Sequence, residues 1–118
     1  MKKLLGIMVL GLLWCNISIA KDITAIGFIN GMETKNEEII RYIKGYLKGA
    51  YSGFLMSQVE LNEKVFCVPG ELILNEENLV SMVDEQIKIY KKINVYRDDF
   101  PVTFFLMDSL KRVFPCQE

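Results

Sequence analysis

Two cysteines, Cys67 and Cys116, constrain this 118-residue chain more than any other feature of its sequence. The first stands in the motif Phe66-Cys67-Val68-Pro69 and the second in Phe114-Pro115-Cys116. Between them lie two stretches whose apolar residues repeat at helical spacing. We predict that a disulfide joins Cys67 to Cys116 and staples these two helices together, with two free buried thiols as the alternative.

The first twenty residues have the pattern of a secretory signal peptide. Lys2 and Lys3 precede an apolar run from Leu4 to Trp14, and small residues lead to Ala20, after which we expect cleavage. The apolar run is shorter than the roughly 20 residues that span a bilayer. An uncleaved membrane anchor and a lipidated Cys15 are the alternatives. Export exposes the chain to an oxidising compartment, which favours the disulfide, and residues 21–118 then form one small domain with no membrane segment.

Two helical segments are expected before Cys67. The stretch 21–32 predicts a short helix stopped by Gly31 or, alternatively, an extended arm, because glycine weakens helices. A longer helix is expected from Asn36, a suitable N-cap, to about Leu61.

Two further helical segments are expected between the cysteines. Asn75 caps a helix that runs to about residue 93. The last helix is predicted to be capped by Asp98 or Asp99, to carry Pro101 in its first turn, and to end at Pro115.

These patterns predict an all-α fold, a small helical domain of about four helices stapled by one disulfide. Its core is expected to consist of the apolar or small residues that repeat at helical spacing on one face of each of the three longer helices. These are Ile39, Ile43, Tyr46, Leu47, Ala50, Phe54, Leu79, Met82, Val83, Ile87, Tyr90, Val102, Phe105, Leu106, Ser109, Leu110 and Val113.

Three glycines, Gly45, Gly49 and Gly53, recur every four residues inside the predicted 36–61 helix. Together they cost the helix about 2–3 kcal/mol relative to alanine. Such a cost calls for a compensating role. We predict that another backbone approaches closely along this line, which glycine permits; a flexible hinge is the alternative.

The sequence lacks the residues on which most catalytic sites depend. It contains no histidine, which removes Ser-His and Cys-His catalysis and the commonest metal ligand. Its formal net charge is −1, without a basic stripe, so nucleic acid is not an expected partner. We therefore expect neither an enzyme nor a cofactor or metal site. Four adjacent acidic pairs do not indicate a catalytic carboxylate pair, because neighbouring residues do not face each other on a helix. These pairs are Glu37-Glu38, Glu76-Glu77, Asp84-Glu85 and Asp98-Asp99.

The cysteine motifs and the helices between them resemble the Rap/Tai family, small periplasmic immunity proteins that protect bacteria from type VI secretion amidase effectors. The family pattern is Cys-x-Pro, a helix, a variable connection, a helix and Phe-Pro-Cys, and Cys67-Val68-Pro69 and Phe114-Pro115-Cys116 match it. The tyrosine- and glycine-containing stretch 42–50 also resembles the family's long helix. Many members carry a second cysteine pair that begins at this helix, and residues 35–40 have no cysteine.

The resemblance implies a periplasmic protein that binds a secreted peptidoglycan amidase, occludes its active-site groove and catalyses nothing itself. Relatives are often dimeric, so a homodimer is also expected. The main alternative is a small envelope protein with another binding role, such as a periplasmic chaperone or an assembly factor. We interpret six residues as candidates for a partner or dimer surface: Phe104 and Met107, opposite the core face of the last helix, and the loop residues Tyr96, Arg97, Asp98 and Asp99.

A purely structural role for these six residues also remains open. The side chains of Phe104 and Met107 either form an exposed apolar patch or pack under the N-terminal segment. The loop is either a recognition element or a solvated turn.

Overall fold

The computed structural model describes residues 22–117, which form four α-helices and no β-strand. They are α2 (Ala25–Glu33), α3 (Glu37–Leu61), α4 (Glu76–Lys92) and α5 (Val102–Val113). The all-α prediction is confirmed, whereas the predicted signal peptide lies outside the described residues. None of the helices within residues 22–117 combines the length and the hydrophobicity that a membrane span requires.

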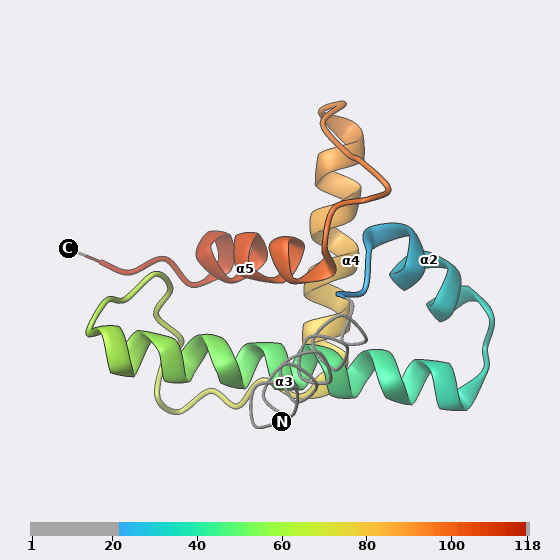
Figure 1. Ribbon diagram of the computed structural model, residues 1–118. Helices are drawn as coiled ribbons and strands as arrows, with labels where there is room; N and C mark the ends of the chain where they lie inside the picture. The colour runs from blue at the N-terminus through green and yellow to red at the C-terminus, as the bar shows by residue number, and fades with distance from the viewer. Residues whose placement is uncertain (1–21, 118) are drawn as a thin grey trace, which may run out of the picture.

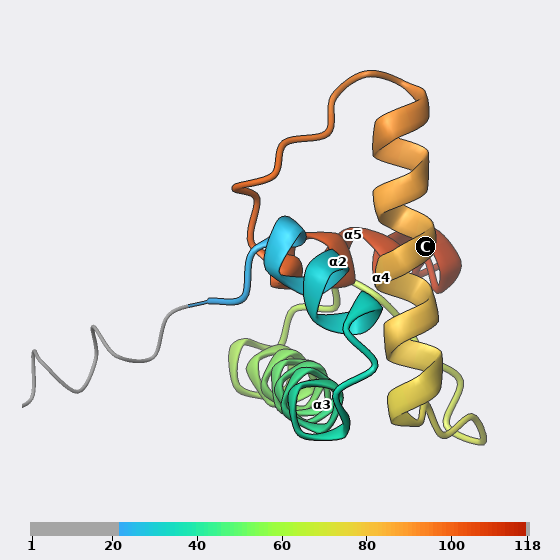
Figure 2. The ribbon, with the colours of Figure 1, turned by 90° about the vertical axis from the view of Figure 1, so that its right-hand side faces the viewer.

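Helix α4 packs against α3 and α5, and α2 packs against α3. Helix α4 crosses both α3 and α5 steeply, and α2 lies over the amino-terminal half of α3 (Figures 1 and 2). The carboxyl end of α4 and the loop that follows it extend away from the other helices (Figure 1).

Asparagine side chains begin the two longest helices, as predicted. Asn36 Oδ1 accepts a hydrogen bond of 3.0 Å from the Glu38 amide at the start of α3. At the start of α4, Asn75 and Asn78 exchange side-chain-to-backbone hydrogen bonds of 2.8 and 3.0 Å. Each bond satisfies an amide that has no partner within its helix.

Helix α2 differs from its prediction because Gly31 does not stop it. The helix continues to Glu33, and Gly31 is buried inside it. A Cβ atom at this position would lie 2.6 Å from Ile43 Cδ1 and 3.1 Å from Ile39 Cγ2. A side chain at this position would force the Ile43 side chain to move, so the close packing of α2 on α3 favours glycine here despite its low helix propensity.

Helix α5 also begins differently from its prediction. Neither Asp98 nor Asp99 caps it; the N-cap residue is Pro101, which makes no side-chain capping bond. The first amide of the helix, on Val102, instead donates to the Ile23 carbonyl oxygen at 2.7 Å. A distant backbone segment thus replaces the predicted side-chain cap.

The core lies between all four helices and includes one residue from the connection between α3 and α4. Ile39 and Val113, which were expected in the core, are 40% and 43% exposed, so their assignment was wrong. Ser109 is fully buried as predicted. Among the other predicted positions, Tyr46, Ala50, Phe54, Met82 and Tyr90 are half-buried. The buried hydrophobic residues are Ala25, Phe28, Ile43, Leu47, Phe66, Leu79, Val83, Ile87, Val102, Phe105, Leu106 and Leu110.

The three glycines of α3 face open space. No atom outside the helix's own backbone lies within 4 Å of a Cβ built at Gly45, Gly49 or Gly53. The predicted close approach of another backbone is therefore wrong for the described chain. Helix α3 runs unbroken through all three positions.

Candidate functional site

The disulfide between Cys67 and Cys116 is present, as predicted, and joins residues 49 positions apart. The two Cα atoms are 4.9 Å apart, and the Cys67 amide donates a hydrogen bond of 2.8 Å to the Phe114 carbonyl oxygen. This pairing fixes the segment after α3 against the carboxyl end of α5. It thereby forms one wall of a surface hollow.

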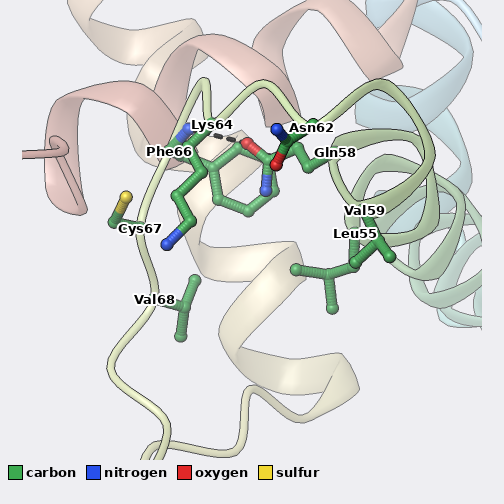
Figure 3. Close-up of a pocket in the computed structure, with 8 residues that line it drawn as sticks. All are labelled: Leu55, Gln58, Val59, Asn62, Lys64, Phe66, Cys67 and Val68. Atoms are coloured by element: carbon green, nitrogen blue, oxygen red, sulfur yellow. Dashed lines mark hydrogen bonds between the residues drawn. The ribbon is translucent and has the colours of Figure 1, made fainter.

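The hollow lies between the end of α3 and the segment that carries Cys67 (Figure 3). Its volume is about 420 Å³, within the range of small-ligand clefts. Leu55 and Val59 line it from α3, opposite Val68 on the far wall, and the Lys64 side chain extends from the connecting loop. The remaining lining residues are Gln58, Asn62, Phe66 and Cys67.

Gln58 holds this hollow in shape. Its Oε1 accepts hydrogen bonds from the amides of Val65 at 2.6 Å and Phe66 at 2.9 Å. Two bonds to one side-chain oxygen fasten the connecting loop to α3 and direct the Phe66 ring into the core, where it is 1% exposed. This role of Gln58 could not be predicted from the sequence, because a polar residue near a helix end gives no signal of the loop that it binds.

Replacement of Gln58 by alanine is expected to lower the free energy of unfolding by about 1–2 kcal/mol, since it leaves two amides without their acceptor. Denaturation by urea measures this loss. Gln58→Glu is the matched control, because it retains an oxygen at the same position. Equal losses in the two variants would show that the hydrogen bonds do not hold the loop.

The predicted recognition loop, residues 93–101, links α4 to α5. Arg97 forms two hydrogen bonds to the Asp99 carboxylate, of 3.1 and 3.0 Å, on the exposed side of the loop. Tyr96 is half-buried against Phe105 at a ring-centroid distance of 6.3 Å. Burial, helped by the Asp98 carboxylate, raises the pKa of Tyr96 to about 12. The loop therefore presents charged side chains outward while an aromatic anchor faces the core.

Backbone hydrogen bonds tie the base of this loop to the start of α2. The Ile26 amide donates to the Asp98 carbonyl oxygen at 3.2 Å, and the Ala25 amide donates to Phe100 at 2.8 Å. An isolated β-bridge pairs Thr24 with Pro101. The base is thus held firmly, whereas the outward charged groups of Arg97 and Asp99 are solvated.

Phe104 and Met107 differ in exposure and in their neighbours. Phe104 is 43% exposed and packs edge-on against Tyr90 at 5.8 Å and beside Phe100 at 5.3 Å. Met107 is half-buried and lines a different, smaller hollow with Phe54 of α3. The structure therefore places Phe104 beside the 93–101 loop, whereas Met107 lies against α3.

Two tyrosine–carboxylate pairs connect distant parts of the chain. Tyr90 on α4 donates a hydrogen bond to Asp108 on α5, and this bond, with burial, raises the pKa of Tyr90 to about 12. Tyr46 on α3 donates to Asp22 at 2.6 Å, and burial together with this carboxylate raises its pKa to about 12.

These pKa values predict a loss of stability at alkaline pH. A tyrosine whose pKa is higher in the folded state than its ordinary value of 10.0 stabilises the fold fully below pH 10. That contribution disappears as the pH rises through about 12, so the free energy of unfolding should fall across this window. Urea unfolding at a series of pH values measures the slope. Tyr90→Phe should flatten it, and an unchanged slope in this variant would contradict the assignment.

Comparison of the chain with protein-family models, with curated proteins and with solved structures finds no match. In the range 22–117, no group of three or more acidic or cysteine side chains is placed to hold a metal ion. The two features of the described surface that the geometry defines are the hollow beside the disulfide and the charged loop.

Proposed function

We propose that this chain is a periplasmic immunity protein that binds and inhibits a peptidoglycan amidase effector delivered by type VI secretion. The proposal depends on the resemblance of the two cysteine motifs to the Rap/Tai family. It is supported by a disulfide that joins the same two motifs in an all-α domain. Inhibition by binding requires shape and charge on a firm scaffold, and it needs no catalytic group.

The observation that carries the proposal furthest is the form of the 93–101 loop. It projects from the body with α4 (Figure 1), its base is hydrogen-bonded to the start of α2, and Arg97 and Asp99 are paired on its surface. A projecting loop whose conformation is fixed before binding loses little entropy when it enters a groove. We therefore assign contact with the amidase groove to Arg97, Asp98 and Asp99, with Phe104 beside them, whereas Tyr96 anchors the loop to the core.

The test is co-purification of the protein with an amidase encoded beside its gene, followed by a peptidoglycan cleavage assay. We expect a stable complex and loss of amidase activity at equimolar protein. Arg97→Glu should weaken inhibition, whereas Lys111→Glu, an exposed reversal on α5, should leave it unchanged. The absence of both complex and inhibition would refute the proposal.

One observation favours a second candidate, an envelope chaperone or assembly factor. The hollow beside the disulfide is lined mainly by apolar side chains, and Val59, which lines it from α3, is 80% exposed. Such a surface suits an unfolded apolar segment. Suppression of aggregation of an unfolded client, without inhibition of any amidase, would support this candidate over the first.

A further inference from the structure

The hollow beside the disulfide continues along α3 into a second, shallower hollow. The first, of about 420 Å³, and the second, of about 350 Å³, share Leu55 and Val59 in their linings. Met56 and Glu60 complete the lining of the second. The two hollows therefore form one trough. It follows α3 from Asn62 back to Leu55, a length of about 10 Å at 1.5 Å per residue.

The trough has one polar end and one apolar end. At the polar end, Lys64 is the one charged residue among those that line the first hollow. At the apolar end, Met56 is 65% exposed and Val59 is 80% exposed. A ligand that removes these apolar side chains from water gains free energy in proportion to the area that it covers.

Three hydrogen-bond donors line the polar end, where the connecting loop leaves α3 (Figure 3). They are the Lys64 ammonium group and the side-chain amides of Gln58 and Asn62. Because Gln58 Oε1 already accepts two backbone amides, its Nε2 group remains as a donor. Lys64 forms no ion pair with another residue of the 22–117 range. This combination of a cation and two amide donors suits a carboxylate.

The acidic groups nearby face other parts of the surface. Glu63 lines the separate, smaller hollow that contains Met107. Glu60 lines the second hollow, at the apolar part of the trough, where its carboxylate disfavours a ligand with a negative group at both ends. The carbonyl oxygens of Gln58 and Val59, at the carboxyl end of α3, both accept the Asn62 amide.

We propose that this trough binds one molecule of a free, single-chain amphiphile with one carboxylate, such as a fatty acid. The carboxylate binds Lys64 Nζ, and the side-chain amides of Gln58 and Asn62 lie beside it. The alkyl chain runs along α3 and covers the exposed apolar side chains of the second hollow. The two ends of the trough thus fix the orientation of the ligand.

The size and firmness of the site favour a small ligand over a protein partner. Eight residues line the first hollow, whereas a stable protein interface takes about 20–30 residues on each side. Its walls are fixed before binding, by the disulfide on one side and by the two hydrogen bonds to Gln58 on the other. The inference goes beyond both functions proposed above, because it requires neither an amidase nor an unfolded client.

The test is calorimetric titration of the purified protein with dodecanoate, below its micelle concentration and at pH 8, where the carboxylate is ionised. We expect saturable binding of one molecule per chain, and weaker binding of the cationic dodecyltrimethylammonium. Lys64→Met keeps the unbranched stem and removes the charge, so it should weaken dodecanoate binding about two- to fivefold. Lys92→Met, at an exposed position at the end of α4, is the matched control and should bind as the wild type does. Absence of saturable binding would overturn the proposal, as would equal affinities in the two variants.

The apolar end is tested by a second pair of variants. Val59→Ser removes apolar surface at an exposed position, so the fold tolerates it, and it should weaken dodecanoate binding about tenfold. Ile93→Ser, at a position 60% exposed beyond the end of α4, should leave the affinity unchanged. Equal effects of the two substitutions would show that the alkyl chain does not lie along α3.

Nuclear magnetic resonance locates the ligand directly. Titration with dodecanoate should shift the methyl signals of Leu55, Val59 and Val68, which line the first hollow. Shifts confined to other methyl groups would contradict the assignment. If an unfolded polypeptide or phosphatidylglycerol vesicles shifted these signals and dodecanoate did not, the trough would belong to that partner and the proposal would fail.

Discussion

Replacement of Phe105 by alanine is expected to lower the free energy of unfolding by about 3–5 kcal/mol. Phe105 is 0% exposed, and four neighbouring aromatic rings pack against its ring. Its centroid lies 5.2 Å from Tyr90, 5.6 Å from Phe104, 6.0 Å from Phe100 and 6.3 Å from Tyr96. The variant therefore loses buried area and edge-to-face contacts and leaves a cavity where α4, α5 and the 93–101 loop meet.

The adjacent phenylalanine provides the matched control. Phe104 contacts the same tyrosine, Tyr90, but is 43% exposed, so Phe104→Ala should cost clearly less, about 1 kcal/mol. Chemical denaturation monitored by circular dichroism compares the two variants on one scale. Similar losses in both would mean that Phe105 is not the centre of the aromatic cluster.

Removal of the disulfide is expected to have an effect of similar size. In the chain-entropy model, a loop closed by residues 49 apart stabilises the folded state by about 4 kcal/mol. Small domains have a total stability of about 5–15 kcal/mol. Cys67→Ser combined with Cys116→Ser should therefore lower the melting temperature by roughly 15–30 °C.

The wild-type protein in a reducing agent is the control for this double variant. Both samples lack the covalent link, but only the variant carries new hydroxyl groups, so equal melting temperatures would attribute the loss to the link alone. A melting temperature within a few degrees of the oxidised wild type would show that hydrogen bonds such as Cys67 to Phe114 suffice.

Local signals in the sequence were enough for the features that depend on neighbouring residues. Asn36 and Asn75 cap their helices because a side-chain oxygen two or three residues away satisfies a free amide. The disulfide was predictable because the expected removal of the first twenty residues leaves two cysteines, which have one pairing to form.

Features that depend on distant segments were not predictable. Gly31 is internal to α2, where Ile43 lies against it. Helix α5 begins at Val102, whose amide donates a hydrogen bond to the Ile23 carbonyl oxygen. The hollow beside the disulfide depends on Gln58 reaching two backbone amides of the next loop. Helical periodicity carries no information on such partners, since it describes only which side of a helix faces inward.

The backbone pairing of Ile23 with Val102 and of Ala25 with Phe100 has a consequence for the order of folding. A chain synthesised from its amino end produces α2 and α3 long before the segment that completes their contacts. Because Val102, Phe105 and Leu110 of the core and Cys116 all lie at or after residue 102, α2 and α3 remain without a complete core until this segment has been synthesised. A nascent chain arrested before α5 should therefore be readily degraded by proteases, and acquisition of the native structure should be a late, nearly all-or-none event.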